Sequence, residues 1–232
     1  MSPLHLVRIP VHAPRLLRFA VDHGIAQEDE TLGYTLHAWF AALFGGLAPK
    51  PFRHLVHRCE VLAYANADAA TLLAQAQAFA SPQAWAALDP EGVASKPMPD
   101  LWRAGQRLRL EVLTCPVSRQ GDVEKDLYLR ALDRLGNAAP PRAEVYRTWF
   151  TEQWADGVRF DQLELLGMNA RSRLLRRARN GTNRLRIVER PQALFSADAV
   201  IVDADRFSGL LARGIGRHRA FGFGMVLLSP PR

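Results

Sequence analysis

Apolar residues in the first hundred positions alternate between strand-like and helical spacing. Residues 4–11 alternate loosely and predict a strand. Apolar residues between Leu36 and Phe44 recur at helical spacing and predict a helix that ends at Gly45-Gly46. The next expected elements are a strand pair or bent strand over 52–64, a helix from an Asp68 cap to about residue 79, and a proline-containing connection over 82–99.

The second half of the chain follows the same order of patterns. Its expected elements are a strand over 106–113, helices over 122–135 and 142–154, a strand over 158–179, a turn at Asn180-Gly181-Thr182-Asn183, a strand over 184–202, a helix over 203–211 capped by Asp203 or Asp205, and a final strand over 223–228. Each half predicts strand, helix, two strands, helix and strand, although the last strand of the first half is not visible in the pattern. The sequence therefore predicts an α+β protein with two tandem ferredoxin-like (RRM-like, βαββαβ) domains, over residues 1–100 and 101–232.

Composition adds a positive charge to an otherwise ordinary globular chain. Of the 232 residues, 48% are hydrophobic and 23% are charged, which excludes disorder and a disulfide scaffold. Lys and Arg total 30 against 23 Asp and Glu, a net charge of +7, and only Lys50, Lys96 and Lys125 are lysines. Codon bias in a GC-rich genome would produce this excess of arginine. It also suits nucleic-acid binding, because guanidinium groups pair well with phosphates and base edges.

The cysteines and the apolar runs of the sequence indicate in which cellular compartment the protein is expected. Cys59 and Cys115 are far apart in sequence, and no group of Asp, Glu, His or Cys has metal-ligand spacing. We expect two reduced cysteines, no metal and no cofactor. The N-terminus has no signal pattern, and no apolar run reaches the ~20 residues that span a bilayer. These features predict a cytoplasmic protein without membrane association.

Residues 165–188 form the most basic segment, and they contain no acidic residue. Their arginines are Arg171, Arg173, Arg176, Arg177, Arg179, Arg184 and Arg186. A hairpin with this charge repels itself, so an anion such as the RNA backbone should neutralise it. Alternate strand residues face opposite sides, so about half of the arginines should reach phosphate and contribute affinity rather than chemistry. The alternative is a solvated edge strand whose charges prevent aggregation.

A glycine-rich segment lies between the last predicted helix and the last predicted strand. Its candidate RNA-binding residues are Gly214, Gly216, Arg217, His218, Arg219, Gly222 and Gly224. The order helix, glycines, strand is the reverse of a dinucleotide-binding fingerprint, and Arg219 occupies the place of the third glycine. Closely spaced glycines let backbone amides approach phosphates. The alternative is a tight turn that leads into an ordinary strand.

Tyr34 and His37 are the candidate catalytic pair. At i and i+3 of a helix they share one face. Imidazole exchanges a proton near pH 7, and a phenol can donate to a developing oxyanion. Such a pair suits metal-free RNA cleavage, in which the 2′-OH attacks its own phosphate. The alternatives are an ordinary structural helix face and catalysis by His218.

Together these segments resemble CasE, the CRISPR RNA-processing endoribonuclease family of subtype I-E Cascade complexes. Residues 213–228 resemble the family's C-terminal motif, in which Arg-Gly-hydrophobic-Gly, a basic stretch and aromatic-Gly-x-Gly precede an apolar strand. Tyr34-x-x-His37 and the apolar residues behind it resemble the N-terminal motif, with Gly45 where the family often has proline. Residues 96–109 match a family segment at the domain junction. The resemblance covers nearly the whole chain.

The resemblance implies an activity and partners. It implies binding of the CRISPR repeat stem-loop and a metal-independent cut at the 3′ base of the stem, with 5′-hydroxyl and 2′,3′-cyclic phosphate products. The resemblance also implies that His37 is the general acid or base and that Tyr34 assists it. It implies that the arginine hairpin binds the stem, and that the glycine segment binds the RNA backbone through Arg217 and Arg219. No lysine follows His37 at the place expected from some family members, and an arginine can fill that role. The implied partners are precursor and mature crRNA and other subunits of a CRISPR effector complex.

Two other functions remain open at this point. A non-catalytic or slow RNA-holding subunit of the same superfamily would share every basic feature, and only the Tyr34/His37 pair separates it from the enzyme. A ribosome-associated or DNA-associated basic module would need neither the pair nor the glycine segment. Similar nucleases also serve other CRISPR subtypes.

Overall fold

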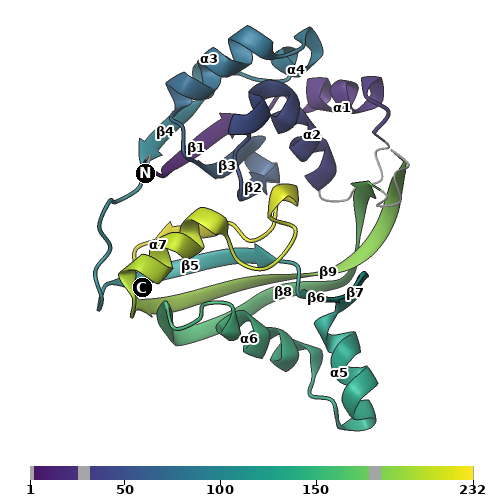
Figure 1. Ribbon diagram of the computed structural model, residues 1–232, viewed down its shortest axis with the longest axis vertical. Helices are drawn as coiled ribbons and strands as arrows, with labels where there is room; N and C mark the ends of the chain where they lie inside the picture. The colour runs from purple at the N-terminus through teal and green to yellow at the C-terminus, as the bar shows by residue number, and fades with distance from the viewer. Residues whose placement is uncertain (1–2, 26–31, 178–183, 232) are drawn as a thin grey trace. The chain divides into compact units, whose positions relative to one another are not determined.

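The computed structural model describes residues 3–25, 32–177 and 184–231, which form two compact units (Figure 1). The first, called here the N-terminal unit, comprises Met1–Asp100, Arg173–Glu189 and Ala220–Gly222. The second, the C-terminal unit, comprises Leu101–Ser172, Arg190–Arg219 and Phe223–Arg232. The linear division expected at residue 100 does not include the two later segments that return to the N-terminal unit.

The N-terminal unit is a four-stranded antiparallel sheet with helices against one face (Figure 1). Its elements are β1 (His5–Pro10), α1 (Ala13–Asp22), α2 (Gly33–Phe44), β2 (Phe52–Leu55), β3 (Glu60–Ala65), α3 (Ala69–Phe79), α4 (Pro82–Ala86) and β4 (Ala94–Pro97). The strand order is β2-β3-β1-β4, so β1 lies between β3 and β4. This is the predicted βαββαβ arrangement.

Three elements of the N-terminal unit were not predicted: α1, α4 and β4, of which α4 and β4 lie inside the connection expected over 82–99. Helix α1 was overlooked, although it buries Leu16, Phe19 and Ala20 on one side. Strand β4 lies inside the expected proline-containing connection, and its residues are mostly exposed. It is a strand because it pairs with β1, from His5 opposite Pro97 to Arg8 opposite Ala94, and this long-range pairing leaves no local apolar pattern.

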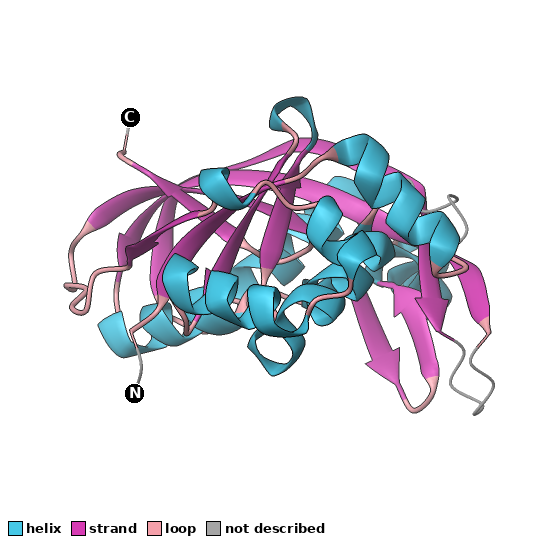
Figure 2. Cartoon of the chain, turned by 90° about the horizontal axis from the view of Figure 1, so that it is seen from above, coloured by secondary structure: helices cyan, strands magenta, loops and turns pink. Residues whose placement is uncertain are grey.

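The C-terminal unit has a second sheet, of order β10-β5-β9-β8. Its elements are β5 (Arg107–Thr114), β6 (Val117–Gln120), β7 (Val123–Asp126), α5 (Leu127–Leu135), α6 (Arg142–Glu152), β8 (Val158–Arg177), β9 (Leu185–Ile201), α7 (Ala204–Arg213) and β10 (Val226–Ser229). Without the β6–β7 hairpin and α5, the order is again βαββαβ, with β5 between β9 and β10. Figure 2 shows the strands gathered into twisted sheets with helices alongside. The predicted α+β class with tandem ferredoxin-like folds is confirmed.

Two boundaries in this unit differ from the expected ones, and a third is decided between two alternatives. The helix expected from residue 122 begins only after Asp126, whose carboxylate accepts from the Tyr128 amide at 2.8 Å, and β7 precedes it. Asp203 rather than Asp205 caps α7, since it accepts from the Arg206 amide at 3.0 Å. The last strand begins at Val226 because the glycine segment before it is irregular. The turn expected at 180–183 lies outside the described residues.

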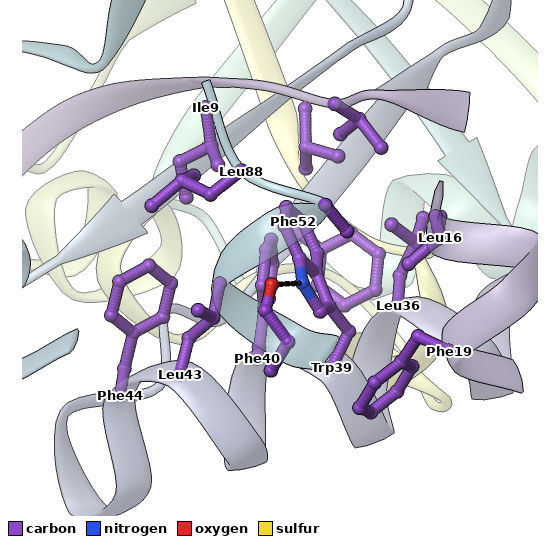
Figure 3. Close-up of a cluster of buried hydrophobic side chains, with 14 of the residues drawn as sticks. Ile9, Leu16, Phe19, Leu36, Trp39, Phe40, Leu43, Phe44, Phe52 and Leu88 are labelled. Atoms are coloured by element: carbon purple, nitrogen blue, oxygen red, sulfur yellow. Dashed lines mark hydrogen bonds between the residues drawn. The ribbon is translucent and has the colours of Figure 1, made fainter. Parts of the chain in front are cut away.

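Helix α2 is fixed by the apolar side that it buries. Its core residues are Leu36, Trp39, Phe40, Leu43 and Phe44, each at most 1% exposed, and they pack near Ile9, Phe52 and Leu88 (Figure 3). The Trp39 indole also donates to the Ala84 carbonyl at 2.9 Å. Side chains this large and this closely packed hold the helix against rotation, so the residues on its other side have defined positions. None of the described helices has the length and apolar character needed to cross a bilayer.

Candidate functional site

One side of α2, which includes the buried Tyr34 and the half-buried His37, lines a pocket of about 480 Å³. Tyr34, His37, Ala38 and Ala41 recur at helical spacing along this side. The other lining residues are Arg176, Arg177 and Phe221, which all belong to the N-terminal unit. The structure thus brings the candidate catalytic pair together with two of the seven hairpin arginines.

Phe221 is the central ring of this pocket. It stacks on Tyr34 with centroids 6.1 Å apart and lies 4.9 Å from the His37 ring. On the same ring, the Arg176 guanidinium carbon lies 4.2 Å from the centroid, a cation–π contact. Tyr34 and His37 meet edge to face at 6.2 Å. The sequence motif contained Phe221 without assigning it a role, because only the fold shows which rings it meets.

His37 is half-buried among positive charges. Burial lowers its pKa below the ordinary value, and the charges of Arg176, Lys50 and Arg177 lower it further. Both effects favour the neutral imidazole, the form that can accept a proton. Lys50 was not recognised from the sequence, because it lies thirteen positions after His37 and approaches through the fold rather than along the helix.

The pocket offers three kinds of group to a ligand: a proton acceptor at His37, a phenol at Tyr34 and guanidinium groups at Arg176 and Arg177. This combination suits a reaction in which a hydroxyl loses its proton next to a phosphate whose negative charge increases. Among the described residues, no group of three or more His, Cys, Asp or Glu side chains is placed to hold a metal ion. The expected absence of a metal stays a prediction.

The other hairpin arginines present their side chains to solvent. Arg171, Arg173, Arg184 and Arg186 are exposed, as is Arg177 at the pocket, whereas Arg176 is half-buried. Arg179 lies outside the described residues. Leu174 and Leu175 are both buried, and Leu175 joins the core of the N-terminal unit. The hairpin was expected to contribute affinity alone, but the position of Arg176 and Arg177 beside His37 also makes them candidates for the chemistry.

The glycine segment closes on itself in the C-terminal unit. The Ile215 amide donates to the Gly224 carbonyl at 2.8 Å, and the Gly224 amide donates to Leu113 at 2.7 Å. A Cβ on Gly224 would lie 2.2 Å from the Ile215 carbonyl oxygen, and its φ of 76° favours glycine. Gly214, Gly216 and Gly222 also have positive φ. The glycines therefore shape the turn, and any contact of their amides with RNA stays a prediction.

The three basic residues of this segment differ in their surroundings. Arg217 Nε donates to Glu124 Oε2 and His218 Nε2 to Glu124 Oε1, both at 2.8 Å. Arg190 Nε also donates to Glu124 Oε1 at 2.8 Å. Arg219 donates to the Arg213 carbonyl at 2.7 Å. His218 is thus buried against an acid, while the RNA contacts expected of all three stay predictions.

Glu124 was not a candidate in the sequence. Burial acts to raise its pKa, yet hydrogen bonds and charge from His218, Arg190 and Arg217 outweigh burial and hold the pKa well below its usual range. Glu124 is therefore ionised throughout the physiological range. No motif marked this residue, because its three partners lie 66 or more positions away.

Comparison with solved structures gives matches over nearly the whole chain. A CRISPR endoribonuclease Cse3 bound to 19 nt RNA has a TM-score of 0.63 at 18% identity, with 98% of this chain and 100% of that chain covered. Thermus thermophilus Cse3 bound to an RNA representing a pre-cleavage complex has a TM-score of 0.59 at 18% identity, with 98% and 100% covered. Cas6e from Escherichia coli K-12 has a TM-score of 0.56 at 16% identity, with 98% and 99% covered. At these identities the likeness establishes the fold.

Comparison with curated protein sequences finds no significant match. The model of the family described as CRISPR associated protein matches residues 4–230, which is nearly the full length. That match confirms the family resemblance drawn from the Tyr34/His37 and glycine-segment motifs. The chain belongs to the CRISPR associated protein family.

Proposed function

We propose that this protein is an endoribonuclease that binds the CRISPR repeat stem-loop and cuts the precursor crRNA at the 3′ base of the stem. The observation that carries the proposal is the pocket in which Tyr34 and His37 face Arg176 and Arg177. Family membership supports it, as does the likeness to the solved structures of the CRISPR endoribonuclease Cse3 bound to RNA.

The proposed reaction is a transesterification within the RNA. His37 accepts the proton of the 2′-hydroxyl, the 2′ oxygen forms a bond to the adjacent phosphorus, and the bond from phosphorus to the 5′ oxygen breaks. The leaving 5′ oxygen takes up a proton from water and His37 returns its proton to solvent, which gives a 5′-hydroxyl and a 2′,3′-cyclic phosphate. Because the nucleophile is already attached next to the phosphate, the step needs no metal-bound water.

The other pocket residues have roles that follow from their charge and contacts. The guanidinium groups of Arg176 and Arg177 stabilise the negative charge that builds on the phosphate oxygens. Either of them fills the role that a lysine has in some family members. The Tyr34 phenol donates a hydrogen bond to the reacting group, and its ring packs against Phe221. The exposed arginines Arg173, Arg184 and Arg186 hold the stem by its phosphates.

We further propose that the protein remains on the mature crRNA within a CRISPR effector complex. Similar chains occur in solved structures of a CRISPR RNA-guided surveillance complex, with TM-scores of 0.54 and 0.57. Arg173, Arg184 and Arg186 do not line the pocket of His37, so the contacts that they make with the precursor stem remain after the cut. Product and substrate are therefore held by the same side chains.

The test is incubation with repeat RNA from the same locus in EDTA, followed by analysis of the product ends. We expect cleavage at a single site, with a 5′-hydroxyl and a 2′,3′-cyclic phosphate. A 2′-deoxy nucleotide at that site should abolish cleavage and leave binding intact. Strict dependence on Mg²⁺, or a 3′-hydroxyl product, would overturn the mechanism. Binding without any cleavage would identify an RNA-holding subunit instead.

A further inference from the structure

Glu124 joins three basic side chains that lie 66 or more positions from it in the sequence. Both of its carboxylate oxygens accept: Oε1 from His218 and Arg190, Oε2 from Arg217. The Glu124 side chain is only 12% exposed and that of His218 only 2%, whereas that of Arg217 is 43% exposed. One end of this cluster is therefore buried, and the other reaches solvent through Arg217.

The Glu124 carboxylate belongs to a hairpin that is held in place by hydrogen bonds to a neighbouring helix. Glu124 lies in β7, opposite Arg119 of β6. Arg130 of α5 donates to the carbonyls of Ser118 at 3.3 Å and Val123 at 3.0 Å, which ties the helix to both strands. A group on a short, cross-tied hairpin keeps its position better than one on an irregular loop.

The segment that Glu124 holds is irregular and conformationally demanding. Gly214, Gly216 and His218 all have positive φ, and His218 is not a glycine, so its left-handed conformation at φ 62° needs support from its surroundings. The bond between its ring and Glu124 supplies that support at 2.8 Å. Without the carboxylate, the Arg217-His218 peptide would lose its anchor to β7.

We infer that Glu124 is a positioning residue for RNA binding, which holds the glycine segment and orients the Arg217 guanidinium toward an RNA phosphate. The bond to Glu124 uses Nε and so fixes the plane of the guanidinium, while the terminal nitrogens belong to a side chain that reaches solvent. This role rests on the proposed function. It means that the negative charge of Glu124 favours the binding of RNA, which is itself negatively charged.

The sign of that effect provides the test. Removing an acid from a basic protein should strengthen RNA binding if the acid only subtracts charge. If Glu124 positions Arg217, Glu124→Gln should weaken the affinity for repeat RNA by about tenfold and flatten the slope of log K against log salt by about 0.9, the value for one phosphate contact. Glu124→Asp keeps the charge but shortens the side chain, so it should weaken binding in the same direction.

Asp122→Asn is the matched control. Asp122 lies between the same two strands, is 94% exposed and pairs with Arg119 at 2.8 Å, so its removal changes the charge equally without touching the glycine segment. We expect its affinity to be unchanged or slightly higher. In an Arg217→Ala background, Glu124→Gln should weaken binding less than it does in the wild-type background, because the part of its effect that acts through Arg217 is already lost.

Trypsin cleavage after Arg217 reports on the segment without RNA, and it should be faster in Glu124→Gln. The inference is overturned if Glu124→Gln binds RNA as tightly as Asp122→Asn does. It is also overturned if the losses of affinity caused by Glu124→Gln and by Arg217→Ala add fully in the double variant. If the wild-type protein binds repeat RNA and either of these outcomes is observed, only the role of Glu124 is overturned and the proposed function stands. Wild-type protein that does not bind repeat RNA removes the proposed function and this role with it.

Discussion

Replacing His37 by alanine tests the centre of the proposed reaction. The half-buried ring lines the pocket with Tyr34 and Phe221 and is not part of the core that contains Leu36 and Phe40. The substitution keeps a good helix former in a helix. It removes the one imidazole in the pocket and leaves the aromatic core beneath it in place.

The structure separates the expected loss of rate from any loss of stability. A general acid or base contributes roughly 10² to 10⁴ in rate, which is about 3 to 5.5 kcal/mol of transition-state stabilisation. The contact of His37 with Phe221 at 4.9 Å is an aromatic pair, and such pairs contribute about 0.5 to 1.5 kcal/mol to folding. Because a domain of this size has several kcal/mol of stability, the variant should remain folded while cleavage nearly stops.

The assay is single-turnover cleavage of repeat RNA at saturating protein, together with the affinity for a 2′-deoxy substrate. His37→Ala should cleave 10² to 10⁴ times more slowly with affinity nearly unchanged. His54→Ala is the matched control, since His54 lies in β2 of the same unit and its pKa is likewise lowered by burial and by Arg53. A His37→Ala rate within threefold of wild type, or loss of cleavage in His218→Ala instead, would refute the assignment.

Three further predictions concern the other groups of the pocket. Tyr34→Phe should slow cleavage less than His37→Ala, because the ring stacked on Phe221 remains, and single-turnover rates measure the difference. Arg176→Ala should slow cleavage at saturating protein by roughly 10- to 10³-fold, whereas Arg186→Ala on the exposed hairpin should mainly weaken binding and flatten the salt slope; equal rates for the two variants would contradict the pocket role. The pH dependence of the cleavage rate at subsaturating protein reports the pKa values of the free enzyme. Because the pKa of His37 is lowered, this rate should fall on the acid side only below the ordinary pKa of a histidine. Arg176→Ala should move that limb to higher pH, because a neighbouring positive charge that lowers the pKa is gone.

Elements whose causes are local were predictable from the sequence. The α2 helix follows from its apolar spacing, and Gly45 ends it with a φ of 54°. Asp68 caps α3 by accepting from the Thr71 amide at 2.8 Å, as its position before an alanine-rich run indicates. The helical spacing of Tyr34 and His37 also predicted that they would share one face. In each of these cases the decisive interactions lie within a few residues of chain.

The tertiary structure alone decided what surrounds the candidate residues. β4 is a strand only through its pairing with β1, and Phe221 reaches the rings of Tyr34 and His37 from 184 or more positions along the chain. The charges that lower the pKa of His37 come from Lys50 and the hairpin, and Glu124 draws Arg217 and His218 to a carboxylate that no motif marks. Apart from β4, the sequence by itself determined the order of strands and helices in the two βαββαβ units and the residue types of the site, because apolar periodicity and capping act over short distances. Which charges and rings meet depends on long-range packing, which no local pattern records.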